Sequence, residues 1–389
     1  MKKRFTSKQV LQKAFCGLAL VVLTATLIGC GKNAAPPPSE VVIGVAAPLT
    51  GKYAEMGKDL VNAVRMAVDE RNVQGGIGNK KVRLEVEDDA ASPKDAVTVA
   101  HKLTSNPAII GVVGHMNSGT TLPASTIYGT AGMALVMPVP TNPDITKQGL
   151  QNLLRIPITD DKQGPALVAF ALDHLKKQKL AVIHNKEAYG EGLATEARKA
   201  LEGRGAPPVL FEGVGADTTD FRPLIAKIQS VNPDAVFLGG GTAEAALFIK
   251  QAREQNLTIP FIMGDGCFDT QLMKIAGTAA DGCYVSNIAP TTAPTPKAKV
   301  FYEKFEASYG KIVAFAPLGY VAATMLMDGI EKAPDKTRGG VLAILKSPSY
   351  TFDSILGRFS FEPNGDSRGQ RVFVHEVKNS QFVTVPSDL

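Results

Sequence analysis

The sequence predicts an α/β protein built from two doubly wound parallel-sheet lobes joined by a multi-stranded hinge. From residue 40 onward, short apolar runs alternate with amphipathic stretches of helical length, which is the pattern of βαβ units. The alternation breaks near Thr159-Asp160-Asp161 and then restarts. About 350 residues follow the N-terminal leader, more than one hydrophobic core usually supports. We therefore expect two domains.

The first lobe is expected to open with four strands and three helices. The expected strands are 41–46, 82–86, 108–113 and 134–137, and the expected helices are 56–73, 94–104 and 119–128. After the break, the expected strands are 180–184, 209–212, 235–238 and 261–263, and the expected helices are 163–176, 190–202, 221–230 and 243–256.

The C-terminal part is expected to return to both sheets. The helical stretch 298–332 follows a Pro/Thr-rich segment and has no strands of its own, so we expect it to cover the first sheet. The hairpin-like segments 371–377 and 381–385 are expected to join the second sheet. These assignments give a first lobe of residues 40–159 plus 289–369 and a second lobe of residues 160–288 plus 370–389.

The N-terminus predicts export and lipidation. A basic start precedes an apolar run over residues 14–28 and the tetrapeptide Leu27-Ile28-Gly29-Cys30, which is typical of a cleaved signal peptide (1–29) followed by an acylated cysteine, Cys30. Residues 30–39 are Pro-rich and indicate a tether. The alternative is an uncleaved anchor, but the run is shorter than the roughly 20 residues that span a bilayer. We expect an extracytoplasmic protein, lipid-anchored to the cell membrane.

The leader also explains the formal charge of +5. Five of the 42 basic residues lie in it and no acidic residue does, which leaves 37 basic residues against 37 acidic ones. Nucleic-acid binding requires a basic surface that displaces counterions from phosphates. No Lys/Arg-dense segment follows the tether, so the sequence disfavours a nucleic-acid partner.

Two cysteines remain after Cys16 leaves with the leader and Cys30 takes the lipid. Cys267 and Cys283 are expected to form a disulfide in an oxidising compartment. Two unrelated buried thiols are the alternative.

Recognisable catalytic and metal motifs are missing from the sequence. The glycine-rich segments 75–80 and 239–241 lack the spacing of nucleotide-binding loops, and no Gly-x-Ser-x-Gly elbow occurs. The five histidines are scattered without metal-ligand spacing. The sequence therefore favours a protein that is not an enzyme and needs no metal or cofactor.

Candidate ligand-binding residues follow the expected strands, where open α/β sheets bind ligands. Ser118 begins a helix after the third strand, so backbone N–H groups and the helix dipole favour an anion there. Thr141 lies in the Pro-rich loop after the fourth strand, and Asp265 follows a strand of the second lobe. A carboxylate facing hydroxyls and a helix end suits a zwitterion. The alternatives are a helix cap at Ser118, a stiff connection at Thr141 and a turn at Asp265.

Read together, these segments resemble the branched-chain amino acid binding proteins of ABC transporters, which have the type I periplasmic binding protein fold. The resemblance covers nearly the whole chain from Val41. The segments that carry it are residues 80–89 with Ser92-Pro93-Lys94, Gly114-His115 through Pro123-Ala124-Ser125, residues 141–146, Gly164-Pro165, residues 184–192 and Thr219-Asp220-Phe221.

The resemblance implies a ligand site and partners. It implies that Ser118 and Thr141 bind a ligand carboxylate, that Asp265 and the Val139 carbonyl bind its ammonium, and that Tyr189 closes from the second lobe. The other residues that it places in the pocket are Met56, Asn117, Gly241 and Phe315. It further implies delivery of an amino acid, branched-chain or otherwise apolar, to permease and ATPase subunits.

The chain departs from the family pattern at three positions. Met56 stands where relatives often have an aromatic residue, Asp265 replaces the commoner Glu, and Gly241 replaces a tyrosine. Since methionine is flexible and glycine leaves space, we expect a larger or more tolerant pocket. The same fold binding an amide, urea or aromatic acid, or serving as a ligand sensor for a signalling partner, remains an alternative.

Overall fold

The computed structural model describes residues 40–289 and 295–386. The expected signal peptide, Cys30 and the tether lie outside these residues. Within the described part of the chain, no helix has both the length and the apolarity needed to cross a membrane.

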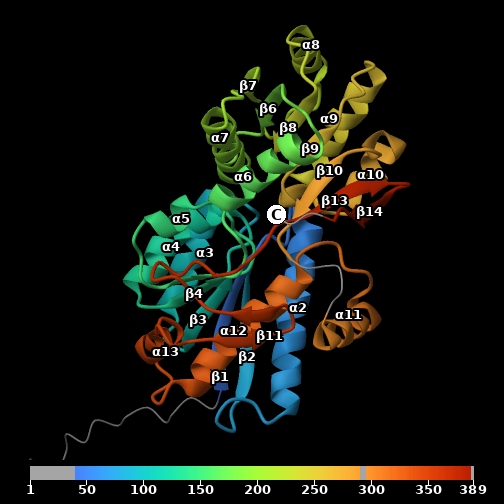
Figure 1. Cartoon of the computed structure of the whole chain (residues 1–389). Coiled ribbons are helices and arrows are strands. Elements are labelled where there is room, and N and C mark those ends of the chain that lie inside the picture. The colour runs from blue at the N-terminus through green and yellow to red at the C-terminus, as the bar shows by residue number, and fades with distance from the viewer. Residues whose placement is uncertain (1–39, 290–294, 387–389) are drawn as a thin grey trace, which may run out of the picture. The chain divides into compact units, whose positions relative to one another are not determined.

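The first lobe is built on a five-stranded parallel sheet with the strand order β2-β1-β3-β4-β5 (Figure 1). Its strands are β1 (Glu40–Ala47), β2 (Lys81–Asp88), β3 (Ile109–Gly114), β4 (Ala134–Met137) and β5 (Leu153–Arg155). The reversal of strand order beside β1 is that of a doubly wound sheet.

The second lobe is built on a seven-stranded sheet with the order β14-β13-β10-β9-β8-β6-β7. Its parallel strands are β6 (Leu180–His184), β7 (Leu210–Gly213), β8 (Ala235–Gly239), β9 (Phe261–Met263) and β10 (Tyr284–Asn287). The hairpin of β13 (Phe373–Lys378) and β14 (Gln381–Thr384) adds an antiparallel edge. A separate small hairpin pairs β11 (Phe352–Ser354) with β12 (Gly357–Phe359).

Helices cover both faces of each sheet. Against the first sheet, α2 (Ala54–Val73), α12 (Ala316–Lys332) and α13 (Arg338–Leu345) pack on one face, and α3 (Pro93–Ser105) and α4 (Ser118–Thr130) on the other. Around the second sheet, α6 (Asp160–Ala169) and α7 (Ala188–Gly203) oppose α8 (Arg222–Ser230), α9 (Thr242–Glu254) and α10 (Gln271–Ala276). The remaining elements are α5 (Asp144–Lys147), α11 (Pro296–Tyr309) and the short turns Phe170–His174, Asp265–Cys267 and Gly277–Ala280.

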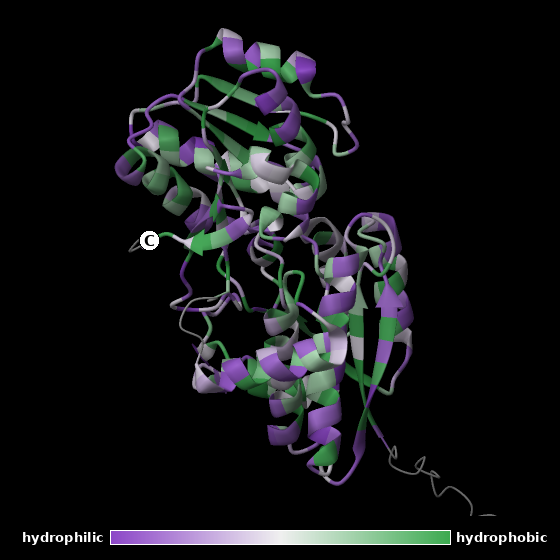
Figure 2. Ribbon diagram, turned by 90° about the vertical axis from the view of Figure 1, so that its right-hand side faces the viewer, coloured by the Kyte–Doolittle hydropathy of each residue, from purple (hydrophilic) through white to green (hydrophobic). Residues whose placement is uncertain are grey.

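Buried strands explain why the apolar runs in the sequence are nearly continuous. Along β1, Ile43 and Val45 belong to the core beneath α2 and α12, whereas Val42 and Ala46 belong to the core beneath α3 and α4. Successive side chains therefore alternate between two apolar layers. Figure 2 shows most strands as hydrophobic between helices of mixed hydropathy, whereas the edge strand β2 carries charged residues. The α/β class predicted from the sequence is confirmed.

Three connections pass between the sheets, after β5, after β10 and after β12. The first and third are tied together: the Arg155 backbone N–H donates to the Gly365 carbonyl at 2.8 Å, and the Ser367 hydroxyl donates to the Ile156 carbonyl at 2.9 Å. Such paired crossings form a hinge that holds two lobes on either side of a ligand.

The structure defines two of the expected helical segments more closely. The helical stretch 298–332 consists of two helices, because Gly310 ends α11 in the left-handed region (φ 88°) and Pro317 lies in the first turn of α12. The helix expected at 163–176 begins earlier, at Asp160. It runs as α6 to Ala169 and continues as a π-helical turn over Phe170–His174. The returning helix does pack on the first lobe, where α12 lies along α2.

The expected disulfide is absent, and both cysteines are free and buried. The Cys267 thiol donates to the Gly240 carbonyl at 3.5 Å, and the Cys283 sulfur lies 3.8 Å from an Arg253 nitrogen. Each sulfur thus has its own polar partner. Burial raises the pKa of Cys283 to about 11 and that of Cys267 well above its usual range, which keeps both as thiols.

Candidate functional site

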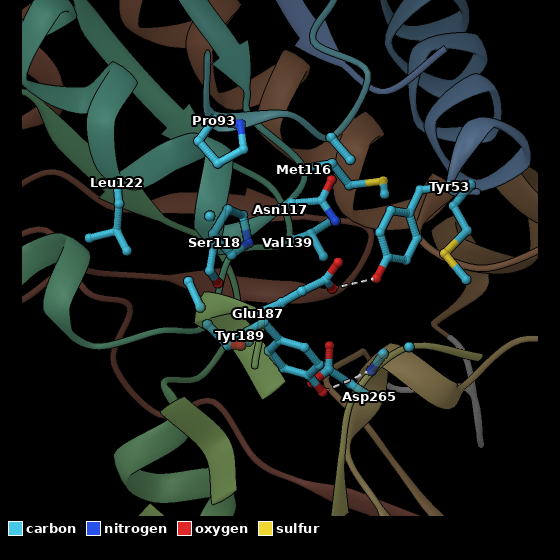
Figure 3. Close-up of a pocket in the computed structure, with 18 of the residues that line it drawn as sticks. Tyr53, Pro93, Met116, Asn117, Ser118, Leu122, Val139, Glu187, Tyr189 and Asp265 are labelled. Atoms are coloured by element: carbon cyan, nitrogen blue, oxygen red, sulfur yellow. Dashed lines mark hydrogen bonds between the residues drawn. The ribbon is translucent and has the colours of Figure 1, made fainter. Parts of the chain in front are cut away.

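One cavity, of about 370 Å³, gathers the residues singled out from the sequence (Figure 3). Its volume is within the usual range for small-molecule sites. Both lobes contribute to the wall. The predicted pocket residues that line it are Met56, Asn117, Ser118, Val139, Thr141, Tyr189, Gly241, Asp265 and Phe315.

The first lobe supplies a helix N-terminus. Asn117 is the N-cap of α4, but its side chain makes no capping hydrogen bond, and Ser118 is the first helical residue. The N–H groups of the first helical turn have no partner within the helix. The Ser118 hydroxyl accepts a hydrogen bond from the Asn142 N–H at 3.3 Å instead of capping. This end of the cavity therefore offers hydrogen-bond donors and a positive dipole end to an anion.

Thr141 reaches the same end of the cavity on the loop after β4. This loop is held from behind by Arg155, which is fully buried and donates to the carbonyls of Pro140 and Asn142, both at 2.9 Å. Its Nε pairs with Asp366 at 2.8 Å. Arg155 thus fixes the loop from a position outside the cavity lining, and the sequence analysis did not identify it.

The second lobe contributes a buried carboxylate. Asp265 opens the turn after β9 and is only 2% exposed. Its Oδ1 accepts hydrogen bonds from Gln163 Nε2 and from the Tyr189 hydroxyl, both at 2.9 Å. Burial raises the pKa of Asp265 to about 6, against the lowering effect of these two donors. The carboxylate has no cationic partner among the described residues.

A second carboxylate, Asp160, lies beside this group. Gln163 Nε2 also donates to Asp160 Oδ1 at 3.3 Å, so one amide bridges both acids. Asp160 is fully buried, and its Oδ2 has no partner within the described residues. Burial, and then the charge of Asp265, raises the pKa of Asp160 well above its usual range. Two neighbouring acids of this kind resist ionising together, because their negative charges repel each other. A bound cation would compensate that charge, so this wall favours a cation.

A cross-lobe contact closes the rim of the cavity. The Tyr53 hydroxyl, from the segment before α2, donates to Glu187 Oε2 of the second lobe at 2.9 Å, and Lys52 pairs with Glu187 Oε1 at 2.7 Å (Figure 3). Asn142 Nδ2 makes a second cross-lobe bond to the Ala188 carbonyl at 2.7 Å. These contacts hold the two walls together.

The rest of the lining is mostly apolar and comes from Met56, Met116, Leu122, Val139 and Phe315. The expectation that Gly241 leaves free space does not hold directly beside it. A Cβ at Gly241 would lie 2.8 Å from the Tyr53 hydroxyl and 3.2 Å from Glu244 Oε1. Tyr53 therefore fills the volume that a larger side chain at Gly241 would take.

Beneath the Ser118 loop lies a buried polar cluster. His115 Nδ1 is 2.6 Å from Asp89 Oδ2, and His115 Nε2 is 3.1 Å from the Tyr128 hydroxyl; all three residues are fully buried. The cluster connects β3, α4 and the loop after β2, so it positions the segment that carries Asn117 and Ser118. It is enclosed and does not line the cavity.

Four residues of the site, Tyr53, Glu187, Asp160 and Arg155, were not identified from the sequence. The signal for Glu187 was available, since it lies two residues before Tyr189 after a predicted strand. Arg155 carried the signal of a charged residue inside an otherwise apolar stretch, whereas Asp160 lies among the polar residues Thr159, Asp161 and Lys162 and carried no such signal. Within the described residues, no group of three or more His, Cys, Asp or Glu side chains is arranged to hold a metal ion.

Comparisons with known proteins identify the family and the fold. Residues 40–381 match the family model described as periplasmic binding protein. The chain is 34% identical to a Leu/Ile/Val-binding protein homolog of Brucella suis, over 91% of this chain and 93% of that protein. It superimposes on the leucine binding protein LivK of Thermotoga maritima with a TM-score of 0.83 at 26% identity, covering 89% and 98% of the two chains. A substrate-binding protein of Desulfitobacterium hafniense, solved with leucine, gives a TM-score of 0.75 at 26% identity over 89% and 100%.

Proposed function

The chain belongs to the periplasmic binding protein family, and on that premise we propose that it captures a free amino acid between its lobes for an ABC transporter. The α-carboxylate would lie at the N-terminus of α4 with Ser118 and Thr141. The α-ammonium would lie against Asp265 and the Val139 carbonyl, and Tyr189 would close over it. The side chain would occupy the chamber of Met56 and Phe315.

The observation that carries the proposal is the buried Asp265 facing a helix N-terminus across one cavity. Burying a charge is costly unless a partner compensates it. An ammonium would give Asp265 its missing counter-ion, and the helix end would pair the carboxylate. A ligand with only one of these groups leaves the opposite wall unpaired, which produces strong discrimination.

The apolar chamber supports a branched-chain or similarly apolar amino acid as the first ligand class. Relatives named for leucine, isoleucine and valine support the same choice. Transport would require permease and ATPase partners, because the sequence contains no ATP-binding loop. Acylation of Cys30 would hold the protein at the membrane that contains them.

A thermal-shift screen of the proteinogenic amino acids tests the proposal. Ligand binding to the folded state raises the melting temperature, so leucine, isoleucine or valine is expected to give a clear rise. Mass spectrometry of ligand retained by protein purified without refolding identifies the natural ligand. No shift with any amino acid would refute the proposal. A shift with an amide, urea or an aromatic acid alone would assign the site to that ligand class instead.

A further inference from the structure

A second cavity adjoins the proposed amino-acid site. It measures about 250 Å³, and its lining includes Lys52, Glu55, Asp269 and Gln271. Tyr53 and Met56 line both cavities and so form their common wall. Met56 is unbranched and flexible, which makes this wall easy to displace.

The side cavity is lined by Asp269, a nearly buried residue with one carboxylate oxygen that has no partner among the described residues. Asp269 is 3% exposed, its Oδ1 accepts a hydrogen bond from the Gln271 N–H at 2.9 Å, and no group of the described residues bonds its Oδ2. Burial raises the pKa of Asp269 to about 6, with smaller contributions from Glu55 and Asp59 in the same direction. A buried acid of this kind is stabilised in its charged form by a cation.

The charges around the side cavity favour a cation. Glu55 lies on its rim and accepts a hydrogen bond from Gln271 Nε2 at 3.0 Å. The one cation among the lining residues is Lys52, and its charge is already paired with Glu187 at 2.7 Å. Lys274, which also acts on Asp269, is exposed and outside the lining. The excess charge of the lining is therefore negative.

The two cavities are also linked by the main chain. Asp265 and Asp269 belong to one segment that starts with a 3-10 turn, and each faces its own cavity. The 3-10 turn covers Asp265–Cys267, and Asp269 lies two residues beyond its end, so the two acids are four residues apart on one short segment. An aliphatic stem can pack on Met56 and Tyr53 while its charged end extends beyond them.

We propose that the side cavity is a subsite for the cationic end of a basic amino acid, with Asp269 as its partner, so that the protein takes lysine-like ligands as well as apolar ones. This inference rests on the proposed amino-acid site, which would hold the α-carboxylate and α-ammonium. The apolar chamber would hold the methylene stem.

Isothermal titration with lysine and norleucine tests the subsite, because norleucine has a similar straight stem without the terminal ammonium. In the unmodified protein, lysine is expected to bind at least as tightly as norleucine, and Nε-acetyl-lysine, which has lost the charge, more weakly than lysine. Asp269→Asn keeps the Oδ1 acceptor. It is expected to weaken the binding of lysine by about 10- to 100-fold while leaving the affinity for norleucine unchanged. Asp217→Asn, at an exposed position outside both linings, is the matched control and should change neither.

The outcomes separate the two proposals. Failure of norleucine, leucine and lysine alike to bind would refute the amino-acid site and, with it, this subsite. Binding of norleucine without lysine would overturn the subsite alone. An unchanged preference for lysine over norleucine in Asp269→Asn would do the same, and norleucine binding verifies that this variant is folded.

Discussion

The two walls of the main cavity differ in how they carry charge. The first-lobe wall contains hydroxyls, backbone groups and the N-terminus of α4, with no ionisable side chain among Asn117, Ser118, Val139 and Thr141. The second-lobe wall contains Asp265, backed by Asp160 and Gln163, and both acids have raised pKa values. Lys186 and Glu187 also line the cavity from the second lobe, but Lys186 is exposed and Glu187 is already bonded to the first lobe. The enclosed donors for a carboxylate are therefore on one lobe and the enclosed acid for an ammonium is on the other, so ligand selection and lobe closure would be one event in this protein.

Removing the charge of the second-lobe wall is expected to have the largest effect. Asp265→Asn keeps the shape of the side chain but leaves a bound ammonium without its counter-ion, at a cost of about 2–5 kcal/mol. We expect leucine affinity to fall by about 100-fold or more in isothermal titration. Asp217→Asn serves as the charge-matched control. Unchanged leucine binding in Asp265→Asn would show that this wall does not bind the ammonium.

Removing one hydroxyl of the first-lobe wall is expected to have a smaller effect. Thr141→Val keeps the branched shape and loses a hydrogen bond to a charged group, which is worth about 1.5–3 kcal/mol. The helix N-terminus still binds the carboxylate, so binding should weaken by about tenfold without being abolished. Thr126→Val, on an outer face of α4 and outside the lining, is the control. Equal losses in the two variants would contradict a ligand contact at Thr141.

Lowering the pH tests the contribution of the Asp265 charge on the second-lobe wall without a mutation. Because the Asp265 pKa is about 6 in the folded protein and about 3.9 in an unfolded chain, the unliganded protein loses stability as the pH rises from about 4 to 6. An ammonium requires the ionised carboxylate, so leucine affinity should be constant from about pH 7 up to the pH at which the ligand's own amino group begins to lose its proton. Below pH 6 it should fall by up to about tenfold per pH unit.

The control for this titration is Asp265→Asn. This variant binds leucine more weakly, and its leucine affinity should depend much less on pH between pH 5 and 7. Any dependence that remains would be assigned to Asp160, the other acid at this wall. A wild-type affinity that is flat down to pH 5 would contradict the titration of Asp265 at the site.

The smallest effect is expected at the contact between the walls. Tyr53→Phe removes the hydrogen bond to Glu187 and should cost about 0.5–1.5 kcal/mol. We expect stopped-flow measurements to show faster leucine release with little change in association. Tyr302→Phe, on α11 away from the cavity, is the control. Slower release in Tyr53→Phe would show that this contact does not hold the lobes closed.

Strand periodicity was enough to predict the α/β class and most element positions, because buried parallel strands are apolar throughout. The short strands β5 and β10 were missed because each includes charged or polar residues, whereas the equally short β4 and β9 were predicted from wholly apolar sequences. The break before α12 depended on Gly310 and Pro317, which the apolar pattern alone obscured. The disulfide was mispredicted because partners for the two sulfurs, Gly240 and Arg253, come from separate segments of the chain.

For the site, the sequence and the family resemblance together identified residues that the structure brings into one cavity. They did not reveal how Tyr53 fills the space beside Gly241, because that contact joins residues nearly 190 positions apart. The bond from Gln163 to Asp265, which are 102 positions apart, was hidden for the same reason. Long-range polar contacts of this kind depend on the packing of the lobes rather than on local sequence.

The central claim is that each lobe binds one charged end of the ligand. The most direct test compares leucine with its two single-charge analogues, 4-methylpentanoate and isopentylamine, by isothermal titration at pH 7.5. All three offer the same kind of branched apolar side chain, but each analogue leaves one wall unpaired. We expect leucine to bind and each analogue to bind at least about 100-fold more weakly. Binding of either analogue as tightly as leucine would contradict this claim.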